Sequence, residues 1–400
     1  MRQGKALLLA ALCLMMAVSA GCGPVQINEL AIVTAVGLDI GEEEGSYRIS
    51  AQIVRSADAR GQTGAPSGGT GEPIYSIAAE GKTIFEAIRN LARFSSRRVY
   101  WAHNFVIVIN DKLAKRGIGD IVDFFTRNPE LRMNTWVVVT SNSAGEVVST
   151  VTGLEVVPGQ AIDKLFRYNR IVGEAPSTNM MRLFEVYMSK TSHPVLARVE
   201  LKNRGISNKK PMEFGSLKQV ELSGAAVFRR DKMVGWLNSE ETKGLLMFIE
   251  SVDSSIVSVS CPRNPAERAT LEVNKQQVRV IPGLKDGKPR FDIHVKATAS
   301  LVETGCSVGF SAMKDELQAE LQKKVKSQLE AVLDKAQHKY RVDFLKLGEV
   351  FNNKYPKQWR EFEGRWEEVL ADSEVDIALD IKITSQELKV DGKGTEGDES

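Results

Sequence analysis

Near the middle of the chain, two short apolar runs and one helical stripe follow each other closely. The runs, residues 225–228 and 233–237, flank four charged residues, which predicts a β-hairpin with its turn in water. A helix start follows, because Asn238 can cap the first turn and Glu241 stands where a capping box needs it. We therefore predict a hairpin joined directly to a helix. Trp236 is expected to be buried beneath this hairpin.

Upstream of this hairpin, runs with strand spacing alternate with runs with helical spacing. The predicted strands are 30–39, 47–54, 135–140 and 195–201, and the predicted helices are 118–125, 144–151, 161–168 and 180–188. Thr83 and Glu86 predict one further capped helix. This alternation predicts a mixed α/β domain. Its end is placed in the polar segment 203–211, which contains Gly and Pro.

Downstream, strands are predicted at 271–280 and 291–301, with a turn-rich segment between them at 282–289. The longest periodic segment, 313–336, repeats apolar residues every four positions, which predicts a long helix with one apolar stripe. That stripe could pack on the chain's own sheet or on a partner helix. Two short helices broken before Pro356 and a strictly alternating strand at 375–383 complete the pattern.

The 400 residues are too many for one ordinary core, so we predict an α+β, multidomain fold with two to three domains. An N-terminal domain at 22–205 precedes a C-terminal α+β domain at 206–388, in which a subdomain boundary can fall near 262. The Gly-rich segment 56–72 contains few apolar residues and is expected to be a mobile loop, and the tail 389–400 is expected to be disordered.

Residues 1–21 have the features of an export signal. Arg2 and Lys5 precede an apolar run at 6–18, and Ala20-Gly21 stands directly before Cys22. This order resembles a lipobox, although Ser19 occupies a position that is usually aliphatic. We expect Cys22 to carry a diacylglycerol, and a soluble protein cut nearby is the alternative. No other apolar run is long enough to span a membrane.

Composition and motifs give no catalytic, cofactor-binding or metal-ligating residues. The formal net charge of +2 argues against nucleic acid as the main partner. None of the histidines has a further ligand at metal-site spacing, and Gly81-Lys82-Thr83 lacks the upstream glycine of a phosphate loop, where Ser76 stands. Cys261 and Cys306 could form a disulfide or remain two buried thiols. We therefore expect that the protein is not an enzyme.

Three stretches carry a resemblance to one family. They are SGAAVF with VGWLN-x-EE-T-x-GLL from Ser223, EGKTIFEAIRN with YWAHNFVIVI from Glu80, and D-x-x-x-x-G-E-x-F-x-x-K-Y-P-x-x-W from Asp343. The start E-L-A-I-V-T-x-x-G-x-D at Glu29 is also similar. The chain resembles the Ger(x)C spore-germination lipoproteins, the C subunits of nutrient germinant receptors, over residues 29–384.

The resemblance implies a multidomain α+β lipoprotein in the inner spore membrane, anchored through Cys22 with its domains on the outer face. It implies a non-catalytic subunit that acts in germination with a membrane-embedded A subunit and a transporter-like B subunit. A lipid-anchored solute-binding protein that delivers a small molecule to a transporter is the alternative. An anchored cell-wall hydrolase would need a reactive acidic or Ser/His site, which the sequence does not show.

Overall fold

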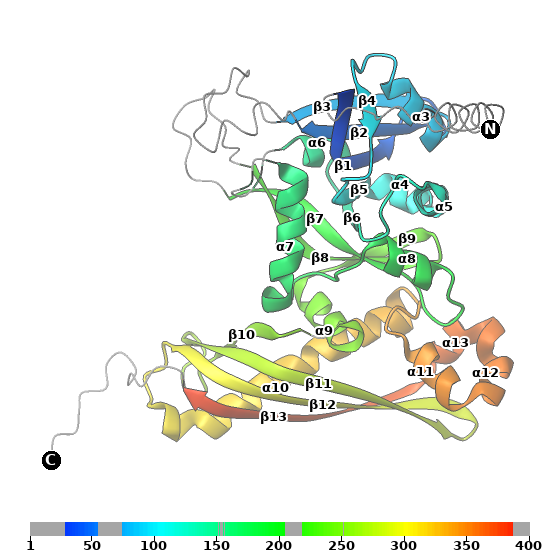
Figure 1. Ribbon diagram of the computed structural model, residues 1–400. Coiled ribbons are helices and arrows are strands. Elements are labelled where there is room, and N and C mark those ends of the chain that lie inside the picture. The colour runs from blue at the N-terminus through cyan, green and yellow to red at the C-terminus, as the bar shows by residue number, and fades with distance from the viewer. Residues whose placement is uncertain are drawn as a thin grey trace, which may run out of the picture.

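The computed structural model describes residues 29–54, 74–204 without 151, 153, 154 and 156, and 218–386 without 251. The expected leader, the loop 56–72 and the tail 389–400 lie outside these residues. The described part holds two β-sheets with helices packed on them (Figure 1), so the predicted multidomain α+β class is confirmed.

The first sheet has nine strands in the order β3-β2-β1-β5-β6-β7-β8-β9, with β4 paired to β1. Its central strands β1, β5, β6 and β7 are parallel and nearly continuous in apolar residues, as strands covered on both faces must be. The bounds are β1 Leu30–Ile40, β2 Tyr47–Val54, β3 Ile74–Gly81, β4 Arg98–Tyr100, β5 Val106–Asn110, β6 Trp136–Thr140, β7 Val195–Asn203, β8 Lys218–Arg229 and β9 Lys232–Leu237.

Helices cover both faces of this sheet, and β5 shows how. Ile107 and Ile109 pack with α3, α4, α5 and α8 in a core that we call the first core, whereas Val106 and Val108 pack in another with α6 and α7. The bounds are α3 Ile84–Leu91, α4 Asp111–Arg116, α5 Gly119–Arg127, α6 Ala144–Ser149, α7 Pro158–Val172 and α8 Met180–Tyr187. Every strand and helix predicted for this half is present.

The second sheet has the order β10-β11-β12-β13, and its strands are β10 Ser254–Ser260, β11 Arg268–Lys285, β12 Lys288–Thr304 and β13 Glu374–Gln386. β11 and β12 form one long hairpin that pairs as far as Lys285 and Lys288. The predicted turn at 282–289 is therefore wrong in extent. Only Asp286 and Gly287, both at positive φ, form the turn, because Asp-Gly suits a two-residue hairpin loop.

One long helix, α10 Phe310–Asp334, packs along the second sheet. Its apolar stripe, which includes Leu317, Leu321 and Leu329, is buried in the chain's own core. A short π-helical turn, Lys335–Lys339, continues it. The helices α11 Leu347–Lys354, α12 Pro356–Phe362 and α13 Trp366–Ala371 follow before β13.

A disulfide joins Cys261 and Cys306, whose Cα atoms are 5.6 Å apart. Cys261 follows β10 directly, and Cys306 lies just after β12, so the bridge ties both strand ends at one end of the second sheet. Of the two alternatives for these cysteines, the structure shows the bridge.

The predicted central hairpin is formed by β8 and β9, and it serves two cores. Ala226 and Phe228 face the first core, whereas Ala225 and Val227 pack with the second sheet. The first sheet thus continues past the expected boundary between residues 205 and 206. The Trp236 ring is only partly buried, with the guanidinium of Arg198 4.7 Å from its centre, so the expectation of a buried ring is corrected.

Helix α9, Ser239–Ile249, begins with the predicted capping box. The Asn238 side chain accepts from Glu241 N at 2.9 Å, and the Glu241 carboxylate accepts from Asn238 N at 2.9 Å. Gly244 then lies against α10 so closely that a Cβ atom there would stand 2.2 Å from the Gln328 carbonyl oxygen. The absence of a side chain at Gly244 allows the two helices to cross.

Because the obstacle at Gly244 is backbone, Gly244→Ala should lower the free energy of unfolding by about 2 kcal/mol, although alanine favours helices. Chemical denaturation measures this change. Gly364→Ala is the matched control, because a Cβ atom there meets nothing within 4 Å. If both variants unfold like the unmodified protein, the close crossing of α9 and α10 is not a constraint.

Candidate functional site

The segment Gly81-Lys82-Thr83 and His103, which were weighed as phosphate-binding or metal-ligating residues, make contacts that are typical of a folded core and its surface. The Thr83 hydroxyl accepts from Glu86 N at 3.1 Å, and the Glu86 carboxylate accepts from Lys82 N at 2.7 Å, so this segment starts helix α3. His103 is exposed beside the Tyr100 ring. Across the described ranges, no group of three His, Cys, Asp or Glu side chains could hold a metal ion.

His193 connects the central hairpin to the C-terminal helices. Its Nδ1 accepts from Arg230 N at 3.0 Å, and its Nε2 lies 3.5 Å from the Glu367 carboxylate. Burial, with the charges of Arg229 and Arg230, lowers the pKa of His193 to about 4. The imidazole is therefore neutral at pH 7 and acts as a hydrogen-bond acceptor at this junction.

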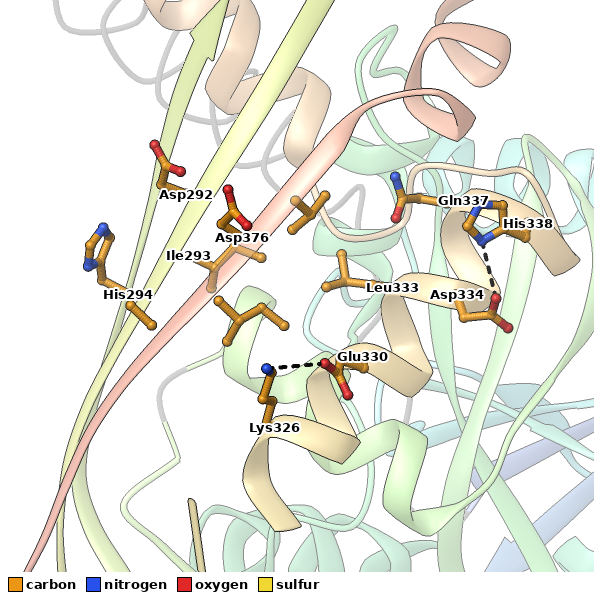
Figure 2. Close-up of a pocket in the computed structure, with 13 residues that line it drawn as sticks. Asp292, Ile293, His294, Lys326, Glu330, Leu333, Asp334, Gln337, His338 and Asp376 are labelled. Carbon is orange, nitrogen blue, oxygen red and sulfur yellow. Dashed lines mark hydrogen bonds and ion pairs between the residues drawn. The ribbon is translucent and has the colours of Figure 1, made fainter. Parts of the chain in front are cut away.

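A cavity of about 610 Å³ lies between the second half of α10 and the strands β12 and β13 (Figure 2). We call it the edge groove. Its apolar residues are buried or half-buried except for Ala378, which is exposed, and charged side chains stand at its rim. The lining residues are Asp292, Ile293, His294, Lys326, Glu330, Leu333, Asp334, Gln337, His338, Val375, Asp376, Ile377 and Ala378.

Strand β13 is an edge of the second sheet, and α10 covers only part of that edge. The Gln322 side chain donates to the Ile381 carbonyl at 3.2 Å, and the Gln318 side-chain oxygen accepts from Ile383 N at 3.1 Å. Beside the edge groove, α10 makes no such contacts with β13 in the described chain. The outer edge of β13 therefore changes from covered to open along its length.

In a strand paired in parallel, the backbone N–H and C=O groups of one residue point to one side of the strand, and those of the next residue point to the other side. Because Ile381 and Ile383 direct their backbone groups away from β12, the N–H and C=O groups of Val375, Ile377 and Leu379 must point the same way. Within the described part of the chain, none of these three residues has a hydrogen-bond partner on that side. An open strand edge of this kind can pair with an added strand.

The rim of the edge groove is acidic. Four carboxylates, those of Asp292, Glu330, Asp334 and Asp376, line it together with the single ammonium of Lys326. Arg290 bridges two of them, at 2.8 Å from Asp292 and 2.9 Å from Asp376. With Arg290 counted, the formal charge is −2. An apolar interior, an acidic rim and an open edge fit an extended peptide with apolar and basic side chains.

These residues come from three separate segments, so the sequence pattern could not bring them together. The one signal in the sequence was the pair of acidic residues Asp376 and Asp380 on the polar face of the last predicted strand, where solvation needs only polar side chains. Cys22, the expected lipid attachment, lies outside the described residues. No helix of the described part is long and apolar enough to cross a membrane.

Two family models match the chain in succession. The spore germination protein N-terminal domain matches residues 23–201, and the spore germination B3/GerAC-like C-terminal domain matches residues 223–387. The chain belongs to the Ger(x)C family of spore germination proteins. The first match ends within β7, and the second begins within β8, so the models divide the chain inside the first sheet.

Individual relatives of this Ger(x)C protein agree with the family models along nearly the whole chain. Spore germination protein KC of Bacillus subtilis (strain 168) is 25% identical over 96% of this chain and 97% of its own length. Spore germination protein B3 of the same organism is 22% identical over 91% and 93%. The crystal structure of the GerBC protein shares the fold, with a TM-score of 0.56 and 20% identity over 88% of this chain and 98% of that chain.

The structure explains why the third resembling stretch of this Ger(x)C protein begins with aspartate and includes glycine five residues later. Asp343 is 1% exposed. One carboxylate oxygen accepts from Leu345 N at 3.2 Å and Leu347 N at 3.1 Å, and the other accepts from Gly348 N at 2.6 Å and the Trp366 indole at 2.9 Å. A Cβ atom on Gly348 would stand 2.8 Å from that indole nitrogen.

Asp343 therefore organises the turn into α11 and holds α13 against it. Burial raises the pKa of Asp343, while the four N–H donors oppose this shift. Each carboxylate oxygen accepts two hydrogen bonds. An NH₂ group in place of either oxygen would therefore point at two N–H donors and could accept from neither.

Asp343→Asn should lower the free energy of unfolding by about 3 kcal/mol, because its amide nitrogen would leave buried N–H groups without an acceptor. Urea denaturation measures the change. Asp372→Asn, at an exposed position, is the control and should shift stability by less than about 0.5 kcal/mol. Equal stability of the two variants would contradict the role assigned to Asp343.

Proposed function

We propose that this protein is a non-catalytic, lipid-anchored subunit of a spore nutrient germinant receptor. It would lie on the outer face of the inner spore membrane and act with an A subunit and a transporter-like B subunit. The observation that carries the proposal is the match to both Ger(x)C domains, from residue 23 to residue 387. The export signal ending at Cys22 supports the location.

The edge groove supports a role in binding other polypeptides. Its open backbone groups at Val375, Ile377 and Leu379 can pair with an extended segment of a partner chain, while the acidic rim selects basic side chains. A second copy fits less well, because two β13 strands paired antiparallel about Ile377 would set Glu374 opposite Asp380, which repel. The occupant we propose is an extended segment of another receptor component.

Anchoring at Cys22 predicts a defined loss. One diacylglycerol supplies the two chains that stable membrane attachment requires, at about 0.8 kcal/mol for each buried CH₂ group. When the membranes are washed with salt, which removes proteins held by charge alone, Cys22→Ala should move the protein from the membrane fraction to the soluble fraction of cells that express it. Cys13→Ala, within the leader, should remain with membranes. Complete retention of the Cys22→Ala variant would show that the lipid is not the essential tether.

Deletion of the gene tests the function itself. Spores without this subunit should lose their response to one set of nutrients, because the receptor lacks a component. Germination triggered downstream of the receptors should be unaffected, which serves as the internal control. If nutrient responses are normal in spores that contain no sister subunit, the assignment is wrong.

The solute-binding alternative makes a different prediction for the same protein. A carrier that delivers a small molecule would bind amino acids or sugars in solution, and calorimetry on the mature chain would detect saturable heats. We expect none, because a subunit that binds partner polypeptides needs no solute site of its own.

A further inference from the structure

Basic and aromatic side chains gather on the outer side of helix α3 and the turn that follows it. Between residues 82 and 98 the chain carries five basic side chains and one carboxylate, a formal charge of +4 in a protein whose total is +2. We call the exposed residues Lys82, Phe85, Arg89, Arg93, Phe94, Arg97 and Arg98 the α3 patch.

The α3 patch follows from the helix period. Ile84, Ala87 and Leu91 are buried in the first core, which turns Phe85 and Arg89 to the opposite side. The Arg89 guanidinium stands 4.8 Å from the centre of the Phe85 ring, and Phe85 and Phe94 are 50% and 54% exposed.

Most of this positive charge is unpaired. In the described chain, Lys82, Arg89, Arg93 and Arg97 have no carboxylate within ion-pair distance, and only Arg98 has one, Glu130 at 3.0 Å. A solvated surface helix usually intersperses both signs of charge. Exposed phenylalanines among unpaired arginines suit an interface where apolar rings and anionic groups occur together.

The start of the fold lies beside the α3 patch. Strand β1 pairs in parallel with β4, and Leu30 stands opposite Arg98. Leu30 lies eight positions after Cys22, and a chain of this length can span at most about 28 Å. A lipid on Cys22 would therefore hold the α3 patch close to the membrane surface.

We propose that the α3 patch is a second membrane contact, which binds anionic phospholipid headgroups and inserts Phe85 and Phe94 at the interface. The proposed lipid anchor supplies the orientation only, since the patch itself needs no lipid on Cys22. Figure 1 shows α3 and β4 at one end of the molecule and the second sheet at the other, so this contact would direct the edge groove away from the bilayer.

The test uses the mature chain with Cys22→Ala, which carries no lipid, and vesicles of phosphatidylcholine with or without phosphatidylglycerol. The chain should sediment with the anionic vesicles only, and added salt should release it. Arg93→Gln with Arg97→Gln should weaken this binding about 25-fold, because each arginine near an anionic surface contributes about fivefold.

Arg263→Gln with Arg279→Gln is the matched control, because these exposed arginines lie in the C-terminal domain and the same charge is removed. It should bind like the unmodified chain, and circular dichroism should show both double variants folded. The proposal is overturned if the chain binds neutral and anionic vesicles equally, if both double variants lose vesicle binding equally, or if the chain binds no vesicles. None of these outcomes depends on germination, so the receptor assignment is tested separately.

Discussion

The crossing of α9 over α10 holds the two sheets of this protein in one arrangement. Gly244 brings the helix backbones together, and α9 follows directly from the hairpin β8–β9, which completes the first sheet. The same hairpin also contacts the end of the α10 segment, where the Tyr340 hydroxyl donates to the Trp236 carbonyl at 2.7 Å. A Cβ atom on Gly235 would overlap the Tyr340 ring at 2.5 Å. Gly235 and Gly244 thus lie where the first sheet and its following helix contact the part of the chain built on the second sheet.

Most elements could be predicted from the sequence because they obey local rules. The capping box at Asn238, the helical stripe of α10 and the alternation of β13 each depend on residues close together in the chain. The extent of the β11–β12 hairpin could not, because proline is typical of turns, whereas here Pro282 pairs with Phe291 and Pro289 with Leu284 inside the strands. The disulfide and the edge groove also depend on distant segments. The partial burial of Trp236 depends on a residue distant in the chain, because Arg198 covers one face of its ring.

The α3 patch and the edge groove lie at different sheets of the protein and differ in charge. The α3 patch is basic and lies where the chain leaves the expected anchor, whereas the edge groove is acidic and lies on the second sheet. A receptor subunit with this arrangement would bind the membrane through the α3 patch at one end and expose the open edge of β13 at the other end. The occupant of the edge groove must then project from the membrane, which a flexible extended segment can do.

Photo-crosslinking in spore membranes measures directly whether the edge groove binds a segment of another receptor subunit. A photoreactive amino acid replaces Asp376 at the rim of the edge groove in the lipidated full-length protein, and the control replaces Arg167 on α7. We expect an adduct from position 376 alone, joined to an extended segment of another germinant receptor subunit that contains basic residues. No adduct at position 376, or an adduct only with a second copy of this chain, would contradict it.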